Sequence, residues 1–227
     1  MYKRAYLYFG LAFAVTLLGF WPSFFQNPAQ NDLAHALHGA LATTWMLMLI
    51  AQSWLISHGQ AAWHRRIGRA SYVIFPAMVL SMAPMIRAML TDKHGLPHDL
   101  ALSLAALDVG SLAVLVAFYA LAIANRRKVA LHMRYMSATV LIAVEPALGR
   151  VLAIYVPFVK GLAGALSPSL WLVAAAGGLL ILDDRRTGRI YPPYPVATAF
   201  LLVMSWAVWQ APHNPGFLAL ARWIAGT

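Results

Sequence analysis

The sequence predicts an all-α protein that spans a membrane as a bundle of about seven helices. Of its 227 residues, 61% are hydrophobic and 11% are charged, whereas a soluble domain carries roughly 25% charged residues. The apolar residues fall in long runs, each near the ~20 residues that a helix needs to cross a ~30 Å hydrocarbon core. About seven such spans use up the chain, so we expect one transmembrane domain over residues 1–227, with six or eight helices as alternatives.

The first four expected spans each follow a charged or polar segment. Residues 5–21 come after a basic start and are not followed by a signal-peptide cleavage site, so we expect a retained helix. Residues 34–56 and 67–90 are separated by a short basic connection. The run 100–124 follows a polar connection that contains Gly and Pro, as is typical of a turn near lipid headgroups.

The last three expected spans are the apolar runs 133–158, 162–182 and 196–209. The first of them follows a basic turn. Pro168 and Pro195 blur the starts of the other two, because proline interrupts the helical hydrogen-bond ladder.

The C-terminal tail, residues 210–227, is too short and too interrupted by proline to span again. Apolar side chains nevertheless recur on one helical stripe in this tail, at Phe217, Leu220, Ala221 and Ile224. We therefore expect a short helix on the outer membrane surface, with Trp223 at the interface.

The distribution of basic residues predicts the orientation of the chain. With a cytoplasmic N-terminus, 12 of the 17 basic residues lie on the inner face: Lys3, Arg4, Arg65, Arg66, Arg69, Arg126, Arg127, Lys128, Arg134, Arg185, Arg186 and Arg189. This bias fits the positive-inside rule and predicts that the C-terminus lies on the outer side of the membrane. We expect this membrane to be the cell inner (cytoplasmic) membrane. The orientation of the chain in the membrane thus accounts for the net charge of +10, and we expect no nucleic-acid partner.

Ionisable side chains within the spans are functional candidates, because they are costly in a bilayer. They predict an outward-facing ligand cavity that binds a small molecule or protons, lined by His38, Trp45, Arg87, Asp108, Glu145 and Arg150. His38, Asp108 and Glu145 are also candidate metal ligands there. In the alternative interpretation, the two arginines only neutralise the two carboxylates in buried pairs that hold helices together.

The second expected span carries His38, Trp45 and Gln52 at intervals of seven residues. Such residues drift only about 20° per step, so they share one face of the helix. This face should meet protein rather than lipid, as a cofactor wall or as a polar seam between helices.

Two histidines are expected at the inner face, because His64 opens the third expected span and His132 the fifth. Such a pair can ligate a b-type haem or a transition-metal ion, with Gln52 nearby and arginines for the haem propionates. In the alternative interpretation, a histidine beside arginines at a helix start anchors lipid phosphate. No cysteine is present, which excludes disulfides and thiolate metal sites.

These motifs resemble those of a family of small polytopic bacterial membrane proteins of unknown function. The resemblance rests on His38 with Trp45 and Gln52, and on three further stretches, His64 to Arg69 with Tyr72, His132 to Met136 and Pro146 to Arg150. It implies a shared helical fold, and it assigns no catalytic residues. A fainter resemblance is to ascorbate-reducible transmembrane b-type cytochromes, whose helix-opening His-x-x-x-Gly motif is similar to the stretch from His64 to Gly68.

We expect the lipid bilayer to surround the protein. Three functional hypotheses follow. The first is a haem or metal redox protein that exchanges electrons with a quinone or another membrane protein. The second is a binding or transport protein that uses the outer cavity, and the third is an accessory subunit of a larger membrane complex. The sequence assigns no catalytic residue and leaves open whether the protein is an enzyme.

Overall fold

The computed structural model describes residues 4–91 and 95–226, and every regular element in these ranges is a helix. Seven helical segments are long and apolar enough to cross a membrane, which confirms the expected number: Ala5–Phe25, Leu33–Ser57, Ser71–Leu90, His98–Ala124, Val129–Tyr155, Gly161–Arg186 and Pro193–His213. The protein is therefore a multi-pass helical membrane protein. Its chain forms two compact units, Met1–Met85 and Ile86–Thr227.

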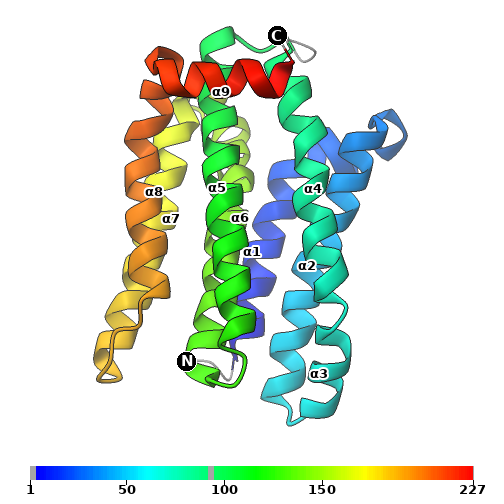
Figure 1. Ribbon diagram of the computed structural model, residues 1–227, viewed down its shortest axis with the longest axis vertical. Helices are drawn as coiled ribbons and strands as arrows, with labels where there is room; N and C mark the ends of the chain where they lie inside the picture. Colours follow the sequence, from blue (N-terminus) through cyan, green and yellow to red (C-terminus); the bar gives the residue numbers. More distant parts are fainter. Residues whose placement is uncertain (1–3, 92–94, 227) are drawn as a thin grey trace. The chain divides into compact units, whose positions relative to one another are not determined.

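The first unit begins with α1 (Ala5–Phe20), which continues as the π-helical turn Trp21–Phe25 and is followed by the 3-10 turn Pro28–Gln30. The next long helix, α2 (Leu33–Ser57), packs beside α1 (Figure 1). Gly39 of α2 lies against the ring of Phe24, which occupies the space that any larger side chain at residue 39 would need. The turn after α1 is thus packed onto α2.

The start of α2 is capped by Asp32. Its carboxylate accepts a hydrogen bond from the backbone N–H of His35 at 2.9 Å and also contacts the His35 ring at 2.9 Å. Because these bonds stabilise the ionised carboxylate, the backbone N–H foremost, they lower the pKa of Asp32 below its usual value. Such a cap satisfies one of the N–H groups that a helix start leaves unpaired.

The third span differs from the sequence prediction, because it begins at Ser71 instead of residue 67. The polar stretch around His64 forms a separate short helix, α3 (Ala61–Gly68), before α4 (Ser71–Leu90). Ser71 ends this break by donating from Oγ to the carbonyl of Gly68 at 2.6 Å. With Arg65 and Arg66 in its last turn, α3 is too polar to extend the apolar span.

The second unit is built around four long helices, α5 (His98–Ala124), α6 (Val129–Tyr155), α7 (Gly161–Arg186) and α8 (Pro193–Gln210). Short turns join them in antiparallel order, as in an up-and-down bundle (Figure 1). The core between them is apolar, with fully buried residues such as Ile142, Leu170 and Leu201. The sixth and seventh spans are α7 and α8, which form although Pro168 and Pro195 lie within them.

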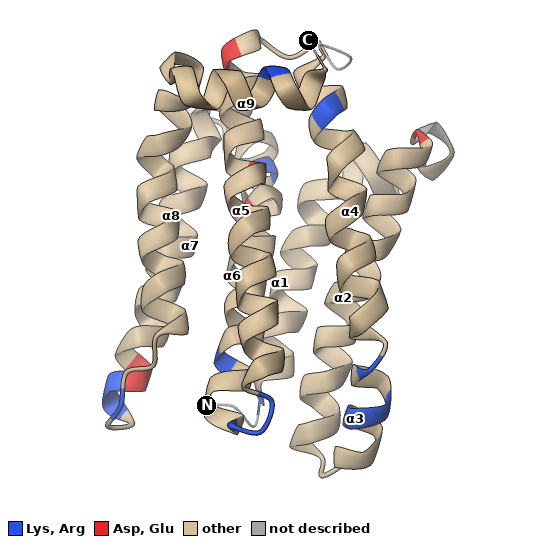
Figure 2. Ribbon diagram, viewed as in Figure 1, with Lys and Arg blue, Asp and Glu red and all other residues tan. Residues whose placement is uncertain are grey.

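Charge is concentrated at the ends of the helices of this second unit. Figure 2 shows Lys and Arg at the α5–α6 turn and at the α7–α8 turn, which lie at the same end of the four helices. Of the basic residues assigned to the inner face, Lys3 lies outside the described part of the chain. A few charged residues lie within α5 and α6 themselves, away from these ends (Figure 2).

The tail forms the expected helix, α9 (Pro215–Ala225), after the 3-10 turn Ala211–His213. It lies across the end of α5 that is opposite the basic turns (Figure 1). Of the expected apolar stripe, Ala221 is buried and Leu220 is 38% exposed, while Trp223 on the other side is 79% exposed. The helix ends at Gly226, whose φ of 80° is the left-handed conformation that glycine adopts at little cost.

Candidate functional site

Two carboxylates lie at matching depth in neighbouring helices of the second unit. Asp108 follows the start of α5 by 10 residues, and Glu145 precedes the end of α6 by 10 residues. These two helix ends are adjacent because a short turn joins the other ends. A rise of 1.5 Å per residue therefore places both carboxylates roughly 15 Å from this end of the bundle.

Glu145 is buried, with 2% of its surface exposed. Its Oε1 accepts a hydrogen bond from Ser169 Oγ of α7 at 2.7 Å. Its Oε2 is also buried and forms no hydrogen bond with any residue of the ranges 4–91 and 95–226. A buried carboxylate oxygen without a partner is costly, so this atom is unusual in a folded protein.

Arg150 provides the positive charge next to these two carboxylates. It lies in α6, where its Nη1 donates to the carbonyl of Pro146 at 3.1 Å. Its guanidinium attracts both Asp108 and Glu145, and the two carboxylates repel each other. We call these three residues the Asp108–Glu145–Arg150 cluster.

The other residues expected in the outer cavity have different surroundings. His38 and Trp45 belong to the first unit, where His38 Nδ1 lies 2.9 Å from Ser81 Oγ and the Trp45 ring lies 5.0 Å from that of Phe75. Arg87, at the end of α4, is exposed and lies beside Gly226 after α9. The cluster accordingly contains three of the six expected lining residues.

Gln52 and His64 lie in contact in the first unit, and the sequence analysis expected them to be close. In the orientation that satisfies its neighbours, the Gln52 amide donates to His64 Nδ1 at 2.7 Å and to the His64 carbonyl at 2.9 Å. Its oxygen accepts from the N–H of Gly68 at 3.2 Å. The close approach at Gly68 is thus made by the side chain of Gln52, which ties α3 to α2.

His132, in the first turn of α6, bonds back across the α5–α6 turn. Its Nδ1 lies 2.9 Å from the carbonyl of Ala122 near the end of α5. A histidine at this place satisfies one of the carbonyls that a helix end leaves unpaired. His64 and His132 belong to different units, and each has a partner that explains its position without a cofactor.

A buried ion pair that the sequence analysis missed joins α6 and α7. Arg134 Nε donates to both oxygens of Asp184 at 2.9 Å, and Nη2 donates to Oδ1 at 2.6 Å. Arg134 is 4% exposed and Asp184 is fully buried. The Arg134 guanidinium also lies 4.0 Å from the centre of the Tyr191 ring, which extends the contact to the α7–α8 turn.

One sequence signal pointed to this pair, because Asp183 and Asp184 are two of only seven acidic residues and lie in an otherwise basic segment. Ser169, the partner of Glu145, had no comparable signal. Across the described ranges, no three His, Asp or Glu side chains gather as a metal ion would require.

The fold and the cluster define a multi-pass membrane protein with ionisable residues inside a four-helix unit. Comparison with known protein families, curated proteins and solved structures finds no match to this chain. Its function therefore has to be inferred from the chemistry of its own residues.

Proposed function

We propose that the protein binds protons at the Asp108–Glu145–Arg150 cluster and moves them across the bilayer. The observation that supports this most directly is the buried Oε2 of Glu145, which lacks a hydrogen-bond partner among the described residues. A proton on this carboxyl group would remove the uncompensated charge at the place where no donor offsets it. Buried ionisable residues within membrane helices commonly serve as proton relays.

Charge counting supports the same conclusion. When all three residues are ionised, two carboxylates face one guanidinium, and one negative charge remains. An isolated charge in a medium of low dielectric constant is strongly unfavourable, so one proton per cluster gives the neutral, more stable arrangement. Arg150 can then pair with the carboxylate that stays ionised.

The depth of the cluster agrees with a relay. Both carboxylates lie roughly 15 Å from one end of helices that are about 40 Å long, so a proton held there is well inside the protein. Ser169 adds a hydroxyl group, which can donate to an ionised carboxylate and accept from a protonated one. The site can thus hold Glu145 in either protonation state.

Proton flux through the reconstituted protein tests this proposal. In proteoliposomes that contain a pH-sensitive dye, a potassium gradient with valinomycin should drive protons inward. Glu145→Gln should lower this flux roughly 100-fold or more, because the amide has a similar shape but takes up no proton. Asp108→Asn should lower it as well, whereas Asp99→Asn, which removes an exposed carboxylate from the first turn of α5, should not.

Infrared difference spectroscopy measures proton binding without transport. As the pH is lowered, the wild-type protein should gain the C=O band of a protonated buried carboxyl group, and Glu145→Gln should lack that band. Unchanged flux and an unchanged band in a folded Glu145→Gln variant would refute the proposal.

The haem- or metal-binding role of His64 and His132 remains a separate prediction. A ligating imidazole normally donates Nδ1–H to an acceptor and binds the metal through Nε2. His132 fits this arrangement through the carbonyl of Ala122. His64 Nδ1 lies 3.2 Å from the backbone carbonyl of Gln52, which suits the same arrangement, and 2.7 Å from the Gln52 amide nitrogen, which would leave the proton on Nε2. The contacts of His132 therefore fit a metal ligand, and those of His64 fit either position of its proton.

A visible spectrum tests this role. If the two histidines hold a b-type haem, the purified protein should show sharp bands on reduction with dithionite, and His132→Ala should remove them. His58→Ala is the matched control, since this exposed histidine lies at the end of α2, where its Nδ1 contacts Ser57 Oγ and the carbonyl of Trp54. A colourless protein expressed with ample haem would refute the haem prediction.

A further inference from the structure

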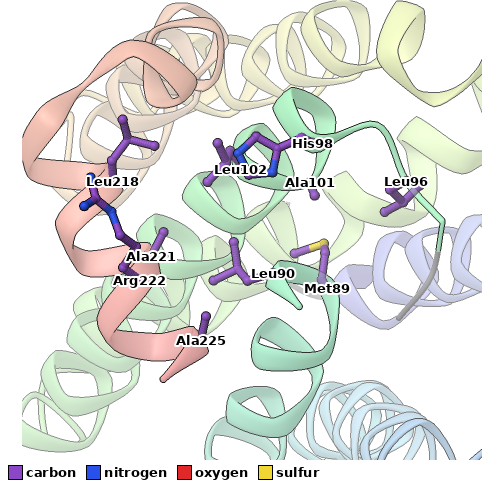
Figure 3. Close-up of a pocket in the computed structure, with 10 residues that line it drawn as sticks. All are labelled: Met89, Leu90, Leu96, His98, Ala101, Leu102, Leu218, Ala221, Arg222 and Ala225. Carbon is purple, nitrogen blue, oxygen red and sulfur yellow. The ribbon is translucent and has the colours of Figure 1, made fainter. Parts of the chain in front are cut away.

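A cavity of about 420 Å³ lies under α9 in the second unit. Its walls come from the end of α4, the segment before α5, the first turns of α5 and one face of α9 (Figure 3). This size falls within the range of ligand pockets in proteins. None of the residues of the Asp108–Glu145–Arg150 cluster lines this cavity.

The walls of this cavity are mostly aliphatic. Met89 and Leu90 of α4 lie across from α9, and Leu102 and Leu218 extend the apolar surface (Figure 3). Ala221 of α9 lines the cavity and is buried there. Its side chain is a single methyl group, which leaves space in the cavity. A hydrocarbon chain matches such a surface, since burying it removes apolar area from water.

Among the described residues, the ionisable side chains that line the cavity are bases. They are Arg222 of α9 and His98 of α5, and both are exposed. Arg87 adds a further cation close by, with its guanidinium beside Gly226. Asp99, which follows His98 in the sequence, does not line the cavity.

The backbone of α5 adds to the positive potential at this place. Its first turn has no side-chain cap, and His98 in that turn lines the cavity. Helix starts favour anions because their first N–H groups lack partners within the helix. Cationic side chains and a helix start thus surround the open side of an apolar cavity.

We propose that this cavity binds an anionic phospholipid, with its hydrocarbon part against the aliphatic wall and its phosphate at Arg222 and His98. Guanidinium groups pair with phosphate through two parallel hydrogen bonds, which favours Arg222 as the main contact. The place suits a lipid, because α9 is an amphipathic helix across the end of a membrane bundle, where headgroups lie. This inference does not rest on the proposed proton transport.

Lipid binding to the purified full-length protein tests the proposal. The protein in detergent is titrated with phosphatidylglycerol or phosphatidylcholine, and the bound lipids are counted by native mass spectrometry. Phosphatidylglycerol should bind more tightly, and Arg222→Gln should weaken its binding about fivefold, as expected for one cationic side chain near a lipid headgroup. Lys160→Gln, which removes an exposed cation outside the cavity, should leave it unchanged.

A second pair of variants tests the apolar part. Ala221→Leu should fill the cavity and reduce phosphatidylglycerol binding, whereas Ala219→Leu on the exposed face of the same helix should not. Equal losses in Arg222→Gln and Lys160→Gln would show diffuse surface attraction and overturn the proposal. Unchanged phosphatidylglycerol binding in Ala221→Leu would also overturn it.

Discussion

Replacing Asp184 with alanine is expected to lower the free energy of unfolding by about 3–5 kcal/mol, since it leaves the buried Arg134 guanidinium without its carboxylate. Arg134 is 4% exposed, so water cannot replace the three hydrogen bonds that Asp184 accepts from it. The loss should also loosen the α7–α8 turn, where the N–H of Tyr191 bonds to Asp184 at 3.4 Å. Chemical unfolding in mixed micelles, followed by circular dichroism, measures this effect.

The neighbouring acid is the matched control for this change. Asp183 has a buried oxygen that lacks a hydrogen-bond partner in the described part of the chain, so Asp183→Ala should cost much less. A double variant, Arg134→Met with Asp184→Leu, should be more stable than Asp184→Ala, because it removes both charges at once. If Asp184→Ala unfolds at the same denaturant concentration as the wild type, the pair does not stabilise the fold.

Replacing Gly177 with valine is expected to cost about 1–3 kcal/mol, because the added atoms overpack the contact between α7 and α8. A Cβ at residue 177 would collide with Thr198 Oγ1 and would also lie 3.8 Å from a methyl group of Leu141. Small residues of this kind allow two membrane helices to approach closely. The same unfolding experiment in mixed micelles measures the change.

The adjacent glycine separates this packing effect from helix propensity. A Cβ at Gly178 would meet nothing within 4 Å, so Gly178→Val changes the propensity of the same helix by a similar amount without overpacking. Adding Thr198→Ala to Gly177→Val should restore part of the lost stability, because it removes the atom that collides. Equal stability of the two valine variants would contradict the close-contact explanation.

The number of spans and their approximate positions could be predicted because they depend on local properties. A run of apolar residues of sufficient length crosses the bilayer as a helix whatever its neighbours are. One difference lies around His64, where the expected third span included residues 67–70 that instead end α3 and connect it to α4. There, a short polar helix precedes the span, and the average hydrophobicity of a window does not resolve such a break.

The candidate site could be predicted only in part. The cost of charge in a bilayer identified Asp108, Glu145 and Arg150 as residues that need partners. It could not show that Ser169 would be the partner of one Glu145 oxygen while the other oxygen is left without one among the described residues. Arg87 was expected beside these residues and instead lies near Gly226, because the sequence does not show how the end of α4 packs within the second unit.

The sequence by itself determined that this protein is helical, that it spans the membrane about seven times and which side chains are costly there, because each depends on residues close together in the chain. Tertiary structure decided which of these side chains meet. Arg134 and Asp184 are 50 residues apart, and Glu145 and Ser169 are 24 apart. Their contacts depend on how each helix is rotated and packed against its neighbours, which is set by the shapes of all facing side chains together.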